Sequence, residues 1–332
     1  MKLNTLLSVA VIFTLVLLES CNDESDNFSG PTAKALEVKV GSGFNNEELR
    51  DVSIDHDGNM YVSAKTKIYK LDASGAATLF AGSNTAGITD GQGTTATFKN
   101  IGLMSFDTNG NIYVVDSLNI RKIDRNQNVT TIVIEKPYQM EFTPAPPFNS
   151  MVLPVGDQFF VAEVGAAAIF RVEGNAFNLF AGDELLSQGF VDGRGTGAKF
   201  LGPSNIILDE TGNNLVVADW GSLRKISIAD STVSTFTGSD KFGKADGTLA
   251  TASYQGIDDL VVDKNGNYYL SSLSTVRKIS KDGQVTTIAG PIKSDGGAFT
   301  AGGLAVDREG NYLYITELKR PATLIKIDLG KL

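Results

Sequence analysis

A short pattern of Asp, two variable residues, Gly and Asn recurs along the chain and constrains its fold more than any other feature. It begins at Asp55, Asp107, Asp209, Asp263 and Asp307. Gly and Asn tolerate the positive φ that tight hairpins require, so each copy indicates a turn between two strands. The copies recur about every 50 residues, with one double-length gap, and such self-similarity is typical of repeat architectures.

A full repeat contains four runs with the composition of β-strands. An apolar run precedes the turn, a run rich in Tyr and Val follows it, a third run ends in Arg-Lys-Ile in three of the repeats, and a fourth is rich in Val and Thr. No run has a helical period of useful length. Residues 148–182 keep the strand rhythm inside the double gap without the turn motif. We therefore predict an all-β fold, a six-bladed β-propeller with four strands in each blade.

The two ends of the repeat region predict how the ring closes. The last unit stops after residues 324–327 and lacks its fourth strand, whereas residues 35–41 match the fourth strand at 76–82. An N-terminal strand that completes the last blade would remove two exposed sheet edges, which otherwise promote aggregation. We expect residues 35–332 to form one propeller domain closed in this way.

A second repeated element begins with Asp-Gly and ends with an aromatic residue. It occupies residues 90–98, 192–200 and 246–254, and in a shortened form 295–299. We expect the Asp-Gly to start a turn and the aromatic side chain to pack between blades. Together with the Asp-x-x-Gly-Asn hairpins, this element resembles the NHL repeat family of six-bladed propellers. The resemblance covers residues 35–332 and implies a recognition surface, although related propellers include lyases and lactonases.

The N-terminus predicts export and lipid attachment. Residues 1–20 combine a Lys with an apolar run shorter than a membrane span, as in a signal peptide. Leu18-Glu-Ser-Cys21 resembles the bacterial lipobox, so Cys21 is the expected lipidation site; the alternative is a leftover thiol in a soluble secreted protein. Residues 21–34 are predicted to form an acidic flexible tether, which resembles the surface-export tag of Bacteroides-group lipoproteins. The expected location is the bacterial outer membrane, on its periplasmic or surface side.

Charge and cysteine content exclude two classes of feature. The formal net charge is −9 and the pI about 4.8, so the chain lacks the basic field that collects phosphates, and no nucleic-acid partner is expected. Cys21 is the only cysteine, which rules out a disulfide within the chain.

Candidate binding residues follow from the position that each repeat would place at the mouth of a central channel. This position is occupied by Asp51, Leu103, Ser150, Asn205, Asp259 and Gly303, with Arg50 and Asp258 beside it. Asp51, Asn205 and Asp259 could together hold a cation such as Ca²⁺, in loose resemblance to lactonase-type propellers. The alternative is a solvated polar rim with no cofactor at all, since a fold does not establish a function.

The only tryptophan, Trp220, is expected on the same face of the propeller. An exposed Trp220 would be a stacking platform for a sugar or a peptide, and the alternative is packing against the adjacent loop. The neighbouring Asp219 precedes Arg224 by the same spacing that separates Asp116 from Arg121. This spacing predicts cross-strand ion pairs that stiffen the loops.

The sequence favours a binding protein over an enzyme. The single histidine, His56, falls in a hairpin turn on the opposite face, so no histidine-rich zinc site and no Ser-His-Asp triad is expected. No catalytic residue is predicted. Our first hypothesis is a lipid-anchored, non-catalytic propeller that binds a glycan, a peptide or an envelope protein. The alternatives are a metal-dependent hydrolase or lyase that uses the channel-mouth carboxylates, and a scaffold subunit of an outer-membrane complex.

Overall fold

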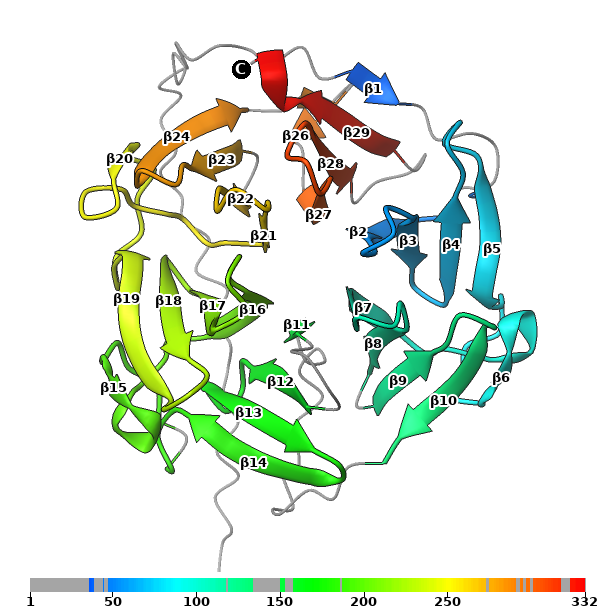
Figure 1. Ribbon diagram of the computed structural model, residues 1–332, viewed down its shortest axis with the longest axis horizontal. Coiled ribbons are helices and arrows are strands. Elements are labelled where there is room, and N and C mark those ends of the chain that lie inside the picture. The colour runs from blue at the N-terminus through cyan, green and yellow to red at the C-terminus, as the bar shows by residue number, and fades with distance from the viewer. Residues whose placement is uncertain are drawn as a thin grey trace, which may run out of the picture.

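The strands form six sheets arranged radially around one axis, as Figure 1 shows in a view down that axis. The all-β six-bladed propeller predicted from the repeats is confirmed. The computed structural model describes residues 36–38, 44, 47–117, 119–133, 150–152, 158–185, 187–272, 275–290, 293–294, 297–298, 301–317 and 323–331. The predicted signal peptide, Cys21 and the acidic tether lie outside these residues.

Each blade is an antiparallel sheet of four main strands, which we call a to d from the channel outward. Blades 1 to 3 consist of β2 (Leu49–Ile54), β3 (Met60–Ala64), β4 (Lys67–Leu71) and β5 (Ala77–Gly82); β7 (Ile101–Phe106), β8 (Ile112–Asp116), β9 (Asn119–Ile123) and β10 (Asn128–Ile132); and β11 (Ser150–Val152), β12 (Gln158–Glu163), β13 (Ala168–Glu173) and β14 (Ala176–Ala181). Blades 4 to 6 consist of β16 (Pro203–Leu208), β17 (Asn214–Asp219), β18 (Ser222–Ser227) and β19 (Thr232–Gly238); β21 (Asp259–Val262), β22 (Tyr268–Ser272), β23 (Thr275–Ile279) and β24 (Gln284–Ala289); and β27 (Ala301–Val306), β28 (Tyr312–Glu317), β29 (Thr323–Asp328) and β1 (Leu36–Val38).

The ring closes through the N-terminal strand, as predicted. β1 pairs antiparallel with β29, with Leu36 opposite Lys326 and Val38 opposite Leu324. The outermost strand of blade 6 therefore comes from the start of the chain and its other three strands from the end (Figure 1).

The Asp-Gly elements do more than the turns that we predicted. They form short fifth strands, β6 (Gly91–Gln92), β15 (Gly193–Arg194) and β20 (Gly247–Thr248), which pair with β10, β19 and β24 on the outer edges of blades 2, 4 and 5. The 3-10 turns η2 (Gly93–Thr95) and η3 (Gly195–Gly197) follow two of them. The sequence signal for a two-residue strand is weak, because its pairing partner lies about 40 residues away and local propensity does not report it.

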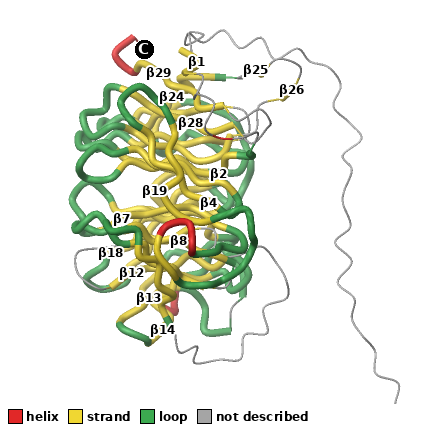
Figure 2. The backbone as a smooth tube through the Cα atoms, turned by 90° about the vertical axis from the view of Figure 1, so that its right-hand side faces the viewer, coloured by secondary structure: helices red, strands yellow, loops and turns green. Residues whose placement is uncertain are grey.

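The remaining described elements are small. β25 (Lys293–Ser294) and β26 (Gly297–Ala298) form a two-stranded hairpin, and η4 (Leu329–Lys331) follows β29. Figure 2 shows the propeller from its edge, with strands between the loops of its two faces. Among the described residues, no helix has both the length and the apolar character of a membrane span.

The repeated Asp closes the a-to-b hairpins of the five blades that carry the motif through hydrogen bonds of its own. Asp55 N–H donates to Asn59 O at 3.0 Å, and Asp55 Oδ1 accepts from the N–H groups of Asp57 and Asn59. Gly58 adopts a φ of +83°, the left-handed conformation that a Cβ would strain. The same bonds recur at Asp107 and Asp263. The motif therefore repeats because it builds the turn.

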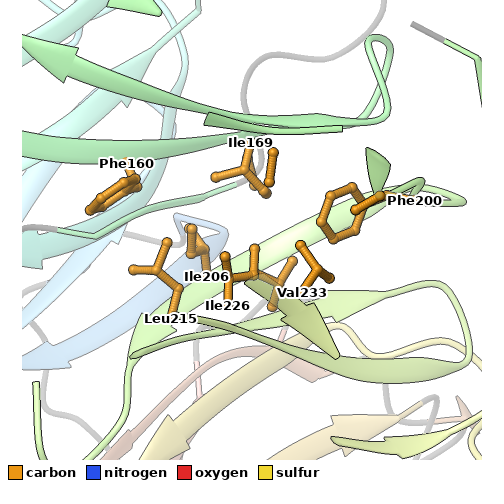
Figure 3. Packing of buried hydrophobic residues seen from close by; sticks show 11 residues of the cluster. Phe160, Ile169, Phe200, Ile206, Leu215, Ile226 and Val233 are labelled. Atoms are coloured by element: carbon orange, nitrogen blue, oxygen red, sulfur yellow. The ribbon is translucent and has the colours of Figure 1, made fainter. Parts of the chain in front are cut away.

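The core lies between blades. Between blades 3 and 4, Phe160 and Ile169 from one sheet pack against Ile206, Leu215 and Ile226 from the next (Figure 3). Phe200, the aromatic end of an Asp-Gly element, is fully buried in the same cluster, and Phe98 and Tyr254 are buried likewise. The prediction that these aromatic side chains pack between blades is confirmed at all three.

A buried arginine clamps three of the Asp-Gly elements to their blades through Asp90, Asp192 and Asp246. Arg224 pairs with Asp219 at 3.2 Å and with Asp192 at 2.6 Å, and its guanidinium lies over the ring of Phe200. Arg121 holds Asp116 and Asp90 in the same way. The predicted Asp116–Arg121 and Asp219–Arg224 pairs are therefore confirmed. Both members of each pair are fully buried, and the clamp fixes the loops above it.

Candidate functional site

Strand direction divides the connections between two faces of the propeller. Because the strands of each blade are antiparallel, the b-to-c turns and the start of the d-to-a connections share one face, which we call the loop-rich face. The a-to-b and c-to-d turns share the other, the short-turn face. Binding residues collect on loops that a rigid scaffold holds in place, so both faces are candidate sites.

The two faces differ in the side chains that they expose. The large hydrophobic side chains that are exposed among the described residues all lie in b-to-c or d-to-a connections: Ile88, Val133, Leu185, Val191, Trp220 and Phe242. The Asp-x-x-Gly-Asn hairpins of the short-turn face use their polar side chains to close the turns. A contiguous exposed apolar patch marks an interaction site, and among these side chains Trp220 and Phe242 are in contact.

Two of these side chains form an aromatic pair between blades 4 and 5. Trp220 in the b-to-c turn of blade 4 stacks on Phe242 in the connection to blade 5, with ring centroids 5.2 Å apart and an interplanar angle of 18°. Trp220 is 50% exposed and Phe242 52% exposed. Trp220 therefore packs on the adjacent loop and still offers half its surface to solvent, and its role as a stacking platform remains a prediction.

The backbone at Trp220 has an unfavourable conformation. Its φ is +60°, in the left-handed region where a side chain with a Cβ costs about 1–2 kcal/mol. Ser117 has a φ of +57° in the equivalent turn of blade 2, so the turn itself imposes the conformation. It does not require an aromatic residue.

Gly221 fixes the turn against the connection that carries Phe242. A Cβ added at Gly221 would meet the carbonyl oxygens of Tyr254, Ser239 and Lys241 at 3.2–3.3 Å. Ser239 N–H also donates to Gly221 O at 3.4 Å. The two ring-bearing segments are therefore in direct backbone contact.

The predicted channel-mouth residues form a buried network. Asn205 Nδ2 donates to Asp259 Oδ1, and Asp259 Oδ2 accepts from the backbone N–H of Leu304. Asp51 Oδ2 accepts from Met104 N–H at 2.8 Å and from the Ser53 hydroxyl at 3.0 Å. These contacts link the inner strands of blades 4, 5 and 6 in one group and those of blades 1 and 2 in another.

Burial corrects the expectation of a solvated rim. Asp51 and Asn205 are each 2% exposed and Asp259 is 5% exposed. Burial raises the pKa of Asp259 to about 7, and burial together with the nearby charge of Asp259 raises the pKa of Asp51 well above its usual range. The described residues contain no group of three or more His, Cys, Asp or Glu side chains placed to hold a metal ion.

The neighbouring candidates have separate positions. Arg50 donates to Asn100 Oδ1 at 2.6 Å and joins blades 1 and 2. Asp258 is exposed beside Asp259, and its charge contributes to the raised pKa of Asp259. Gly303 packs against Asp51, because a Cβ there would lie 2.0 Å from Asp51 Oδ1. Of the six ligand-binding candidates, Asp51, Asn205 and Asp259 meet at the channel, whereas Trp220 lies in a b-to-c turn.

A cavity of about 310 Å³ that the sequence did not reveal occupies the channel beyond this network. It is lined by the ends of strands a, including Ile54, Phe106, Leu208 and Val306, and by His56 in its a-to-b turn. Side chains at 207, 208, 261, 262 and 306 are half-buried for this reason, although they belong to the apolar runs that precede the turns. The periodicity of a fully apolar run does not distinguish a core side from a channel side.

Comparisons with known proteins support the fold. No family model matches the sequence, and no curated protein matches it either. The structure is similar to an auxiliary nutrient binding protein from Bacteroides thetaiotaomicron, with a TM-score of 0.60 at 12% identity over 86% of this chain and 69% of that one. A second such protein, from Bacteroides ovatus, gives 0.59 at 13% identity over 85% and 69%.

The structure is also similar to those of enzymes. A gluconolactonase from Xanthomonas campestris has a TM-score of 0.57 at 11% identity over 86% of its length and 85% of this chain. A catalytically inactive virginiamycin B lyase from Staphylococcus aureus, with quinupristin, gives 0.58 at 10% identity over 99% of its length and 90% of this chain. At these identities the likeness establishes the propeller fold and leaves the function open. The resemblance to NHL repeats remains a prediction.

Proposed function

We propose that this protein is a non-catalytic recognition propeller of the bacterial envelope, held by a lipid on Cys21, that binds a glycan, a peptide or an envelope protein on its loop-rich face. The observation that carries the proposal is the placement of the exposed hydrophobic side chains, which all lie in b-to-c or d-to-a connections among the described residues. The similarity to nutrient binding propellers agrees with it. NHL-type repeats and a location at the outer membrane belong to the same proposal.

The geometry gives less support to the metal-dependent hydrolase. A catalytic carboxylate must reach its substrate, yet Asp51 and Asp259 are buried and accept hydrogen bonds from the backbone of neighbouring blades. His56 is exposed on the short-turn face, at the opposite end of the channel from the carboxylates. A recognition role requires neither an accessible carboxylate at the channel mouth nor a histidine beside it.

Charge substitutions on the two faces test the proposal. The full chain would be screened by surface plasmon resonance against immobilised envelope glycans and peptides, and each bound ligand would then be checked by mass spectrometry for chemical change. Ile88→Asp and Leu185→Asp add charge to the loop-rich face, whereas Ala73→Asp and His56→Asp add it to exposed turns of the short-turn face. We expect the first two variants to weaken binding and the ligand to be recovered unchanged.

Two outcomes would contradict the proposal. Loss of binding only in the short-turn variants would place the ligand on the short-turn face. Recovery of a chemically converted ligand would favour the hydrolase. A stoichiometric membrane partner retained in place of any glycan or peptide would favour the scaffold alternative.

A further inference from the structure

The aromatic pair of Trp220 and Phe242 leaves one flat face open on each ring. A stack with an interplanar angle of 18° covers one face of each ring, and each residue remains about half exposed, at 50% and 52%. The exposed half of this aromatic surface contributes nothing to stability, although burial of an aromatic side chain is among the largest favourable contributions. Packing alone therefore does not explain the pair.

The pair is held rigidly before any ligand arrives. Trp220 lies in a two-residue turn between the paired residues Asp219 and Ser222, and Asp219 is fixed by the buried Arg224. Phe242 follows Ser239 and Lys241, whose carbonyl groups pack against Gly221. A preorganised surface loses little conformational entropy on binding.

The equivalent turn in blade 2 shows that the aromatic residue serves no local structural need. Ser117 adopts the same left-handed φ there, at +57° compared with +60° at Trp220. A bulky residue in this region is an outlier whose cost is commonly tolerated for function. The tryptophan is thus an addition to a turn that folds without it.

The surroundings of the pair identify the chemistry of its ligand. The exposed side chains of Asp240 and Lys241 lie in the same connection as Phe242 and offer an acceptor and a donor beside the rings. The negative face of an aromatic ring attracts weakly positive C–H groups. A pyranose ring presents such C–H groups on its faces and hydroxyl groups around its edge, so it matches both features.

A protein partner matches less well. Specific protein interfaces bury about 800 Å² on each side around a continuous apolar centre. The other exposed hydrophobic residues of the loop-rich face lie in other connections: Ile88, Val133, Leu185 and Val191. A nucleic acid, whose bases also stack on aromatic rings, would be repelled by the net charge of −9.

We propose that Trp220 and Phe242 form a carbohydrate-binding platform, on which a pyranose ring of an oligosaccharide stacks against the open indole face. The side chains of Asp240 and Lys241 bond to its hydroxyl groups. This inference rests on the proposed recognition function and names its ligand class and its site.

The chain contains its own probe for this site, because Trp220 is the only tryptophan. Maltohexaose, cellohexaose and mannohexaose would be titrated into the full chain while the tryptophan emission is recorded. We expect at least one of them to give a saturable shift of the emission to shorter wavelength, since stacking removes water from the indole. No saturable change with any of the three would overturn the inference.

Substitutions test whether sugar affinity depends on the aromatic pair or on other exposed residues. By calorimetry with the sugar that binds, Trp220→Ala should weaken affinity by at least about 10-fold and Phe242→Ala by a smaller factor, while Trp220→Phe retains part of it. Lys281→Ala, which shortens an exposed side chain in a c-to-d turn of the short-turn face, is the control and should leave affinity unchanged. Unfolding midpoints of all four variants should confirm that each is folded.

The outcomes also separate this inference from the proposed function. If Ile88→Asp and Leu185→Asp abolish binding of a peptide or protein while Trp220→Ala does not, the proposed recognition function is retained and the carbohydrate platform is rejected. If no substitution on the loop-rich face affects the binding of any ligand, both the recognition function of this face and the carbohydrate platform are rejected.

Discussion

The carboxylate of Asp51 in blade 1 accepts a hydrogen bond from the backbone N–H of Met104 in blade 2, at 2.8 Å. Met104 belongs to the innermost strand of its sheet, whose channel side has no neighbouring strand in the ladder. Asp259 makes the same bond to Leu304 of blade 6. The inner carboxyl groups thus replace a missing strand partner and join adjacent blades.

The raised pKa of Asp259 predicts that stability depends on pH. With a folded-state pKa of about 7, the folded protein keeps a proton that the unfolded chain releases above about pH 4. The free energy of unfolding should therefore fall as pH rises from about 4 to about 7, by up to about 1.4 kcal/mol per pH unit from this group. Urea unfolding followed by circular dichroism across this range measures the slope.

Asp259→Asn removes the titrating group and serves as the control. The difference in unfolding free energy between the variant and the native protein should change with pH, and parallel curves would contradict the prediction. The pKa of Asp209 is lowered to about 2, despite its burial, by hydrogen bonds from Asn214, Thr211 and Lys225. The stabilising contribution of Asp209 is lost only as pH falls below about 4. Asp209 therefore does not affect the change in unfolding free energy between about pH 4 and about pH 7.

Removal of Asp219 should be strongly destabilising. Asp219→Ala removes one of the two carboxylate partners of the fully buried Arg224 and the acceptor for the N–H groups of Leu201 and Gly202, and each buried group left unsatisfied costs about 1–3 kcal/mol. Asp57→Ala breaks the exposed pair with Arg125 and should cost less than about 1 kcal/mol. Equal losses in urea unfolding would show that the clamp is not the stabilising element.

Gly303 should not accept a methyl group. A Cβ at this position would lie 2.0 Å from Asp51 Oδ1 and 2.7 Å from Asp51 Cα, so Gly303→Ala must displace the network and should cost about 1–3 kcal/mol. Gly197→Ala, where a Cβ would meet nothing within 4 Å, should change stability by less than about 0.5 kcal/mol. Thermal unfolding of the pair tests this, and a neutral Gly303→Ala would refute it.

Deletion of the N-terminal strand should open blade 6. A chain that begins at residue 42 lacks β1 and exposes the outer edge of β29, whereas a chain that begins at residue 33 retains the pairing. We expect the shorter chain to melt at least about 4 °C lower and to aggregate, because an open edge pairs with other chains. Equal melting temperatures and equal solubility would count against the closure.

Calcium should not stabilise the channel network. Asp51 and Asp259 already accept backbone hydrogen bonds, and burial favours their neutral forms, which bind cations poorly. The melting temperature should therefore stay constant up to millimolar calcium, since a ligand of the folded state would raise it. A rise that Asp51→Ala abolishes would restore the metal-site hypothesis.

The repeats predicted the fold because each hairpin is encoded locally. The Asp-x-x-Gly-Asn turn carries its own hydrogen bonds within five residues, so its recurrence indicated the blades and the closure by β1. The ion pairs of Asp116 and Asp219 were predictable for the same reason, since five residues separate each from its arginine. The second partners, Asp90 and Asp192, lie about 30 residues away, and nothing local indicates them.

The candidate site was predicted less completely because burial near the axis depends on all blades at once. The positions of Asp51, Asn205 and Asp259 around the channel followed from the repeat, but their burial did not. Trp220 was placed correctly on the loop-rich face. Its partner Phe242 lies in a connection without a repeated motif at that position, so no sequence signal pointed to it.

The pairing of β1 with β29 has a consequence for how the protein reaches its native state. Residues 36–38 cannot form their strand hydrogen bonds until residues 324–326 have been synthesised. A chain that ends before β29 can therefore fold only into an open arc of blades. Such an arc offers unpaired strands at both of its ends until the chain is complete. The incomplete chain is therefore prone to aggregate with other chains until β29 has been made and has paired with β1.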